Sequence, residues 1–252
     1  MPRTAVKTII GNPFTELSSV NSTNIYAMEQ IQANLAVPGQ AYFALEQTAG
    51  KGQRGREWLT APGENILLSV IVAPDFLGIH QQFHLSAMVA VACYDFLQPY
   101  ISEELSIKWP NDIYWRDRKT GGILIESSIL GDKWQWAVVG IGININQTAF
   151  PGLAQKAVSL KEITGKEYNP VELARELCQC LSKRYLELQN DGFSAILETF
   201  RRNLHKKGQL VKLRKEHAVG NYLVKTVSEK GELVVEAGIE QVFSNGQVEW
   251  LG

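Results

Sequence analysis

The chain has few of the residues that build disulfide frameworks and metal centres, with three cysteines and four histidines among 252 residues. An odd number of cysteines in a chain of this length argues against a disulfide framework, so reduced thiols in the core are expected. His80 and His84 have the spacing of a zinc-protease motif, but Gln81 stands where the catalytic glutamate is required. The scarcity of these residues therefore excludes a disulfide-stapled protein and a zinc protease.

The chain also lacks an excess of one charge and a long apolar run. Its 25 basic and 26 acidic residues leave a formal charge of -1, which provides no overall field to attract nucleic acid or an anionic membrane. The apolar run 66–73 contains Ser69 and is far shorter than the ~18 residues of a membrane-spanning helix. The N-terminus has no apolar secretory segment followed by a small-residue cleavage site. We expect a cytoplasmic protein without a membrane partner.

Hydrophobic periodicity alternates between helical and strand patterns over the first 204 residues. Helices are expected from Ser22 or Thr23 to Leu35, ended by Pro38-Gly39, and over 83–97, from the Asn169-Pro170 cap onward, and over 193–204. Strands are expected over 41–46, 65–73, 106–109, 113–115, 122–128 and 134–140. This pattern predicts an α/β (α+β) fold in which helices cover a mixed or antiparallel sheet.

The pattern changes after Leu204 to short alternating strands separated by glycines. These strands are expected over 209–214, 222–228, 232–236 and 247–251. Such a series predicts a small SH3-like β-barrel. The expected organisation is therefore a main domain over 1–204 and a barrel over 205–252.

A glycine-rich segment lies between the first two expected strands. Gly50, Gly52 and Gly55 satisfy the pattern G-x-G-x-x-G. A dinucleotide site requires a helix after the last glycine, yet residues 58–63 read as a loop that leads into a strand. A phosphate-binding P-loop would need Lys-Ser/Thr where this chain has Arg-Glu. Neither nucleotide motif is therefore assigned here.

The same segment carries three cations, Lys51, Arg54 and Arg56, with no acidic residue before Glu57. Glycines let a backbone approach a ligand closely, and guanidinium groups bind phosphate oxygens in pairs. The segment is predicted to bind an anion. A solvated basic hairpin is the alternative reading of these residues alone.

Three further segments combine strand residues with polar or glycine positions. Lys108-Trp109-Pro110-Asn111-Asp112 places two polar side chains at a strand end, because the residue before a proline is extended. Lys119 is expected in the turn that precedes Gly121-Gly122-Ile123-Leu124-Ile125-Glu126. In Gly140-Ile141-Gly142-Ile143-Asn144, glycines inside a strand indicate close approach of a ligand or of another backbone.

Taken together and in order, these motifs resemble those of the biotin protein ligases. The matching segments are Ser22-Thr23-Asn24, Gly50 to Trp58, the K-W-P-N-D sequence at 108–112, K-x-x-G-I-L-x-E at 119–126, and the G-I-N strand at 142–144. The resemblance spans residues 20–146 and extends more weakly to the C-terminal strands. It implies the fold shared by these ligases and class II aminoacyl-tRNA synthetases, followed by the SH3-like barrel.

The resemblance implies a reaction in two steps. The biotin carboxylate attacks the α-phosphorus of ATP to give biotinyl-5'-AMP and pyrophosphate, and a lysine of a carrier protein then takes the acyl group. Two like charges about 4 Å apart repel by ~4 kcal/mol at an effective dielectric constant near 20, so the site has to supply cations. The implied substrates are biotin, ATP with Mg²⁺, and the biotin carboxyl carrier protein of acetyl-CoA carboxylase or a similar enzyme. No tightly bound prosthetic group is implied, and the family accommodates homodimers.

Site roles follow by matching each position to the family's motifs. The residues implied for biotin binding are Ser22, Thr23, Asn24, Gln47, Lys51, Gly52, Gln53, Lys119 and Gly122. Those implied for nucleotide binding are Arg54, Arg56, Trp58, Asn111 and Asn144. Those implied for catalysis are Lys119, Arg54, Arg56, Asp112 and Lys108, with Asp112 also a Mg²⁺ ligand.

The chain departs from the family pattern at two places. Gln53 stands where many members have a second arginine that orders the loop over the adenylate, so retention of the intermediate is expected to be weaker. Only 21 residues precede Ser22, which is too few for the helix-turn-helix head of the members that also repress transcription. Specific DNA binding is therefore not expected.

Two other functions fit parts of the pattern. A lipoate or octanoate ligase has a related fold, although such relatives generally lack the full basic glycine loop. A non-catalytic nucleotide-binding adaptor is the second alternative, and the presence of Lys119 together with Arg54, Arg56 and Asp112 argues against it.

Overall fold

The computed structural model describes residues 8–101, 103–153 and 155–251. Its strands are β1 (Phe14–Val20), β2 (Ala41–Gln47), β3 (Asn65–Val72), β4 (Leu105–Lys108), β5 (Asp112–Trp115), β6 (Arg118–Leu130), β7 (Lys133–Asn144), β8 (Leu210–Lys215), β9 (Ala218–Val227), β10 (Leu233–Ala237), β11 (Ile239–Phe243) and β12 (Glu249–Leu251). Its helices are α1 (Thr23–Gln32), α2 (Gln82–Leu97), α3 (Leu160–Thr164), α4 (Pro170–Asn190) and α5 (Ser194–Arg202), with short 3₁₀ turns over Gln53–Gly55 and Ile79–Gln81.

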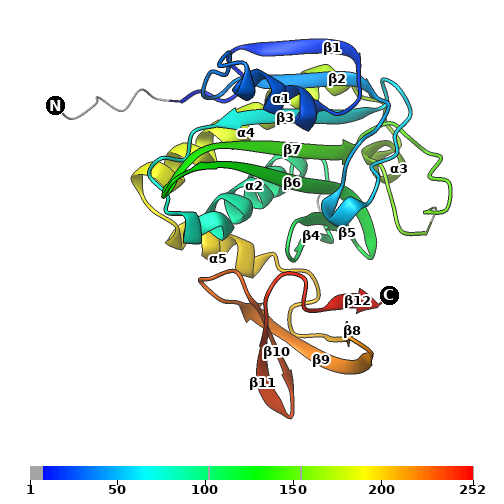
Figure 1. Cartoon of the computed structure of the whole chain (residues 1–252). Helices are drawn as coiled ribbons and strands as arrows, with labels where there is room; N and C mark the ends of the chain where they lie inside the picture. The colour runs from blue at the N-terminus through cyan, green and yellow to red at the C-terminus, as the bar shows by residue number, and fades with distance from the viewer. Residues whose placement is uncertain (1–7, 102, 154, 252) are drawn as a thin grey trace.

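The strands form a large sheet and a small sheet. The seven strands of the large sheet lie in the order β1-β2-β3-β7-β6-β5-β4, and β1 runs parallel to β2 while the other pairs are antiparallel. Figure 1 shows the small sheet on the far side of α5 from the large one. The expected α/β architecture, a mixed sheet with flanking helices, is confirmed.

Helices cover the large sheet on both faces. Adjacent side chains of a strand point to opposite faces, so Phe43 packs in the main core while Tyr42 belongs to a smaller cluster with Ala27 of α1. Figure 1 shows α2 and α4 behind the sheet and α1 in front of it. The face that α1 covers only in part leaves room for a pocket beside the start of that helix.

Local sequence explains the longest helix. Asn169 caps α4, and its Oδ1 accepts a hydrogen bond from the backbone N–H of Val171 at 3.0 Å, while Pro170 occupies the first helical position. Cys178 is buried on the inner face of this helix and Cys180 is half-buried. The expected helix is confirmed, and its cysteines are reduced, as expected for core thiols.

Several expected boundaries differ in the structure. The edge strand β1 was not expected, because its residues alternate only weakly in polarity. Helix α1 ends at Gln32 and not at Leu35. Lys119, expected in a turn, lies inside β6 opposite Tyr114, because the β5–β6 connection is tight and β6 starts at Arg118.

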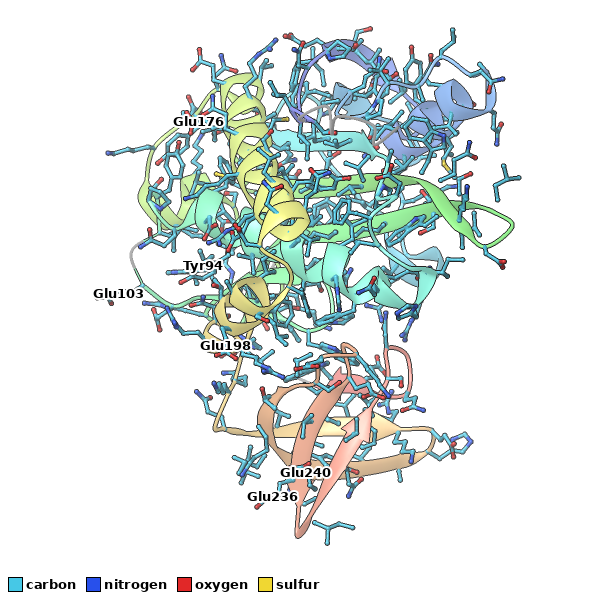
Figure 2. The ribbon with its side chains drawn as sticks, turned by 90° about the vertical axis from the view of Figure 1, so that its left-hand side faces the viewer. Tyr94, Glu103, Glu176, Glu198, Glu236 and Glu240 are labelled. Atoms are coloured by element: carbon cyan, nitrogen blue, oxygen red, sulfur yellow. The ribbon has the colours of Figure 1, made fainter. Side chains whose placement is uncertain are left out.

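The small sheet contains five strands in the order β11-β10-β9-β8-β12. Strand β11 was not expected, since its sequence is short and follows Gly238 directly. Over the described residues β11 pairs only with β10 and β12 only with β8, so the SH3-like sheet is open and not a closed barrel. Figure 2 shows Glu236 and Glu240 on this sheet, well away from Glu176 and Glu198 on the helices of the main layer.

None of the helices in the described ranges is both long enough and apolar enough to cross a bilayer.

Candidate active site

A pocket opens on the face of the large sheet beside the N-terminus of α1. Strands β6 and β7 form its floor, and α1, the end of β2 and the glycine-rich loop form its walls. Its lining includes Ser22, Thr23, Asn24, Gln47, Lys51, Gly52, Gln53, Trp58, Asn111, Lys119 and Gly122. Segments as far apart in the sequence as Ser22 and Gly142 thus contribute to one cavity.

One end of the pocket is polar and buried. Gln47 Oε1 accepts a hydrogen bond from the Thr23 backbone N–H at 2.8 Å, and the Thr23 hydroxyl oxygen lies 3.1 Å from the same Gln47 oxygen. Ser69 Oγ lies 2.7 Å from Thr23 Oγ1 and 2.6 Å from Asn24 Oδ1. Asn24 Nδ2 in turn donates to Glu126 Oε2 at 2.7 Å. A continuous chain of hydrogen bonds therefore fixes the side chains that a ligand meets here.

Glycines of β7 leave space for two of these side chains. A Cβ built at Gly140 would lie 2.2 Å from Asn24 Oδ1, and one built at Gly142 would lie 2.5 Å from Trp58 Cε2. Both positions therefore require glycine. The sequence predicted close approach of a ligand or of another backbone, whereas the groups that approach these glycines in the structure are the side chains of Asn24 and Trp58.

The Trp58 indole covers the middle of the floor. Within the described residues its Nε1 is buried and has no hydrogen-bond partner. Lys119 Nζ lies 5.4 Å from the centre of a Trp58 ring, within reach of a cation–π contact. This nitrogen lies close to the floor strand, because a Cβ built at Gly142 would be 2.7 Å from it.

The other end of the pocket carries charge. Lys119 Nζ and Asp112 Oδ1 are 2.7 Å apart. The pairing of β5 with β6 sets this contact, because Asp112 lies opposite Gly122 and a bulge after Ile113 shifts the register by one residue. Asn111 Nδ2 donates to the carbonyl of Ile123 at 2.6 Å, which fixes the end of β4–β5 to the floor.

The glycine-rich loop is a tight hairpin. The Gly52 N–H donates to the Arg56 carbonyl at 2.7 Å, and the Trp58 N–H donates to the Gly50 carbonyl at 2.9 Å. A Cβ at Gly50 would lie 2.5 Å from the Trp58 carbonyl oxygen, so only glycine permits this crossing. The loop projects Lys51 and Gln53 into the pocket.

The two arginines of the loop lie outside the pocket lining. Arg54 has a left-handed backbone with φ of 57°, and its Nη2 donates at 2.9 Å to Oδ1 of Asn245, in the turn between β11 and β12. Arg56 is exposed. Burial raises the pKa of Tyr114 in β5, and the positive charge of Arg56 partly opposes that rise. Their expected contacts with phosphate stay predictions.

Lys108 lies between the two sheets. Its Nζ is 4.4 Å from the Tyr114 ring centre and 5.3 Å from the Trp250 ring centre. Burial lowers the pKa of Lys108 below its ordinary value, although Asp112 opposes the shift. Trp109 beside it donates from Nε1 to the Gly231 carbonyl at 2.9 Å. The K-W-P-N-D segment therefore contacts the small sheet as well as the pocket.

Asn144 also lies outside the pocket lining. Its Nδ2 donates to the Val158 carbonyl at 3.2 Å and to the Lys119 carbonyl at 3.4 Å. These bonds hold the strand of Lys119 against the segment before α3. The nucleotide contact expected of Asn144 stays a prediction, and its observed role is to support β6.

Two residues of the site, the buried Ser69 and the half-buried Glu126, carried no role in the sequence interpretation. Ser69 is fully buried in β3, in a run that reads as plain core. Glu126 closes the K-x-x-G-I-L-x-E motif, yet nothing local showed that it would contact Asn24, 102 residues away. For Ser69 the available signal was a polar residue inside the otherwise apolar run 66–73.

The described residues contain no cluster of three or more histidine, cysteine or carboxylate side chains that could hold a metal. Asp112 is the carboxylate at the charged end of the pocket. Mg²⁺ in nucleotide sites needs only one or two protein carboxylates, because the phosphates and water supply its other ligands. The residues present therefore fit a metal that arrives with a nucleotide.

Comparison with known proteins defines the class. Residues 16–144 match the model of the biotin/lipoate A/B protein ligase family. This match covers the pocket and all the strands of its floor, and the chain belongs to that family.

Individual relatives are named as ligases, several of them as biotin ligases. The chain is 30% identical to the bifunctional ligase/repressor BirA of Bacillus spizizenii over 94% of its own length and 74% of that protein. It is 30% identical to the biotin--[acetyl-CoA-carboxylase] ligase of Paracoccus denitrificans, over 87% of this chain and 92% of that protein. The biotin protein ligase from Aquifex aeolicus, solved with biotin and ATP, superposes with a TM-score of 0.80 at 26% identity, covering 94% of this chain and 97% of that one.

Proposed function

We propose that this protein is an ATP-dependent biotin protein ligase, which activates biotin as biotinyl-5'-AMP and transfers it to a lysine of a biotin carboxyl carrier protein. Family membership and relatives of nearly the same length support the activity. The observation that carries the assignment is the pocket itself. It joins a buried hydrogen-bonding end to a cationic end, and biotin likewise joins a urea ring to a carboxylate.

The polar end is assigned to the biotin rings. Thr23, Asn24 and Gln47 supply the fixed polar groups there, and the Ser22 hydroxyl makes no capping hydrogen bond to α1 in the described structure. Gly52 and the Lys51 and Gln53 side chains border the same space from the loop. Gly122 leaves the floor low enough for the valeryl chain to reach Lys119.

The charged end is assigned to the reaction. In the first step a biotin carboxylate oxygen bonds to the α-phosphorus of ATP, and the bond from that phosphorus to the bridging oxygen of pyrophosphate breaks. Lys119 offsets the repulsion between the carboxylate and the phosphate. In the second step the carrier amine bonds to the acyl carbon, AMP leaves with the acyl–oxygen electron pair, and the amine loses a proton.

Nucleotide contacts are assigned to the residues around this end. Trp58 and Asn111 border the pocket, and Arg54, Arg56 and Asn144 lie just outside it. Asp112 would hold the Mg²⁺ that accompanies ATP, and the ion would neutralise phosphate charge. Lys108, beside Asp112 in the β4–β5 pair, adds a further cation.

The remaining assignments concern organisation and partners. We propose that residues 1–204 form the catalytic domain and residues 205–252 the SH3-like domain. The carrier is that of acetyl-CoA carboxylase or a similar enzyme, as the name of the Paracoccus relative suggests. A homodimer and the absence of specific DNA binding stay predictions that sedimentation and footprinting would test.

A biotin-dependent ATP–pyrophosphate exchange assay tests the proposal. Exchange of labelled pyrophosphate into ATP should require biotin and should not occur with lipoate or octanoate in its place. Exchange driven by lipoate or octanoate would establish the related ligase activity instead. Binding of ATP without any exchange would establish a non-catalytic adaptor.

A further inference from the structure

We propose that Ser69 and Glu126 set the hydrogen-bonding polarity of the pocket, so that Thr23 accepts an N–H of the ligand and cannot donate to it. Glu126, Asn24, Ser69 and Thr23 together form what we term the polar relay. Ser69 and Glu126 are positioning residues in it, because they act through the side chains that border the pocket. This inference rests on the proposed function, since the recognised N–H belongs to the urea ring of biotin.

The relay begins with the orientation of the Asn24 amide. Its Nδ2 lies 2.7 Å from Glu126 Oε2 and 3.3 Å from the Leu124 carbonyl oxygen. A carbonyl and a carboxylate can only accept hydrogen bonds, so the NH₂ group has to face them. The Asn24 carbonyl oxygen therefore faces Ser69.

The number of hydroxyl protons fixes which oxygen donates at each contact between Asn24 and the ligand. Ser69 Oγ is 2.6 Å from Asn24 Oδ1, and only the Ser69 proton can lie between these two oxygens. Ser69 Oγ is also 2.7 Å from Thr23 Oγ1, and the proton at that contact has to come from Thr23. The longer contact of 3.1 Å from Thr23 to Gln47 Oε1 is left without a proton, and Gln47 Oε1 is satisfied by the Thr23 backbone N–H.

Two groups then face the ligand with fixed roles. The Thr23 hydroxyl donates its proton to Ser69, so the Thr23 oxygen presents only lone pairs to the ligand. Gln47 has its oxygen engaged, so its NH₂ group remains available to donate. An adjacent acceptor and donor match the N–H and C=O of a urea edge. Ser69 is fully buried, so water cannot replace Thr23 as the donor to the Ser69 oxygen.

The test uses cyclic carbamate analogues of biotin, in which a ring oxygen replaces one of the two urea N–H groups. The unmodified full-length chain should bind one of the two analogues at least about tenfold more weakly than biotin by titration calorimetry, because two acceptors would then face each other. In Ser69→Ala the Thr23 hydroxyl is free to rotate and donate. Biotin should bind more weakly there, and the ratio between biotin and the analogue should fall towards one.

Variants at the start of the relay protect the test against misfolding. Glu126→Met should let the Asn24 amide rotate, so the ratio of biotin affinity to carbamate affinity should again fall towards one. Glu126→Gln keeps a carbonyl acceptor for Asn24 and should preserve this ratio. Tyr42→Phe is the matched control, since the Tyr42 hydroxyl is buried near α1 without a partner among the described residues.

Each outcome has one meaning. An unchanged ratio in both Ser69→Ala and Glu126→Met, or equal binding of biotin and both carbamates by the parent chain, overturns the relay. Failure of the parent chain to bind biotin at all overturns the proposed function instead.

Discussion

Replacing Lys119 by methionine removes the one lysine that both borders the pocket and pairs with Asp112, while keeping a side chain of similar length against Trp58. Lys119 Nζ lies 2.7 Å from the Asp112 carboxylate, and the Lys119 side chain is 29% exposed, so solvent screens it only in part. A hydrogen bond to a charged group contributes about 1.5–3 kcal/mol. If the contact is made in the transition state, its loss slows adenylation by one to two decades, at about 1.36 kcal/mol per decade.

The assay is biotin-dependent ATP–pyrophosphate exchange, with kcat and the KM for biotin measured separately. The loss should appear in kcat, because Lys119 offsets a repulsion that arises only when the biotin carboxylate approaches the α-phosphorus. Lys225→Met is the matched control: Lys225 also forms an ion pair, with Glu236 at 2.9 Å, but on the small sheet. Exchange by Lys119→Met at the parental rate would refute the role given to this residue.

Three further predictions concern the loop and the junction between the sheets. Gln53→Arg adds a cation beside the pocket and should slow release of biotinyl-5'-AMP, measured as the off-rate of the labelled intermediate; an unchanged off-rate would count against it. Asn245→Ala removes the 2.9 Å contact to Arg54 and should raise the protease sensitivity of the loop, whereas equal cleavage would show that the contact does not restrain it. The pKa of His205 is lowered from 6.5 to about 4, mainly by burial and further by the charges of Lys108 and Lys206. As pH falls from 6.5 to 4, His205 is therefore protonated in the unfolded chain but not in the folded one. The free energy of unfolding should therefore drop by about 2 kcal/mol between pH 7 and pH 5 from this residue, and urea titrations of His205→Asn should lack that part of the slope.

Sequence reasoning located the pocket because its motifs are local. Residues 22–24, the glycine-rich loop and the K-W-P-N-D segment each carry their own turn or strand signals, and all nine residues assigned to biotin border one cavity. The same reasoning missed β1 and placed Lys119 in a turn. The register of the β5–β6 hairpin depends on a bulge after Ile113, and no residue type in the sequence predicts that bulge.

The direction of long side chains was also beyond the sequence. Arg54 was expected to point at phosphate, yet it reaches Asn245, 191 residues further along the chain. An arginine in an exposed loop has several acceptors within reach, and the position of the small sheet decides among them. The roles of Arg54 and Arg56 with a bound nucleotide remain predictions for that reason.

The sequence by itself determined the class of chemistry, the main helices and strands, and the segments that build the pocket, because periodicity, capping and turn residues act over a few positions. The tertiary structure alone decided that Ser69 and Glu126 fix the Asn24 amide, and that the small sheet holds Arg54 and covers Lys108. Hydrogen-bond polarity depends on which donors and acceptors meet within 3 Å, and only the packing of distant strands brings these groups together.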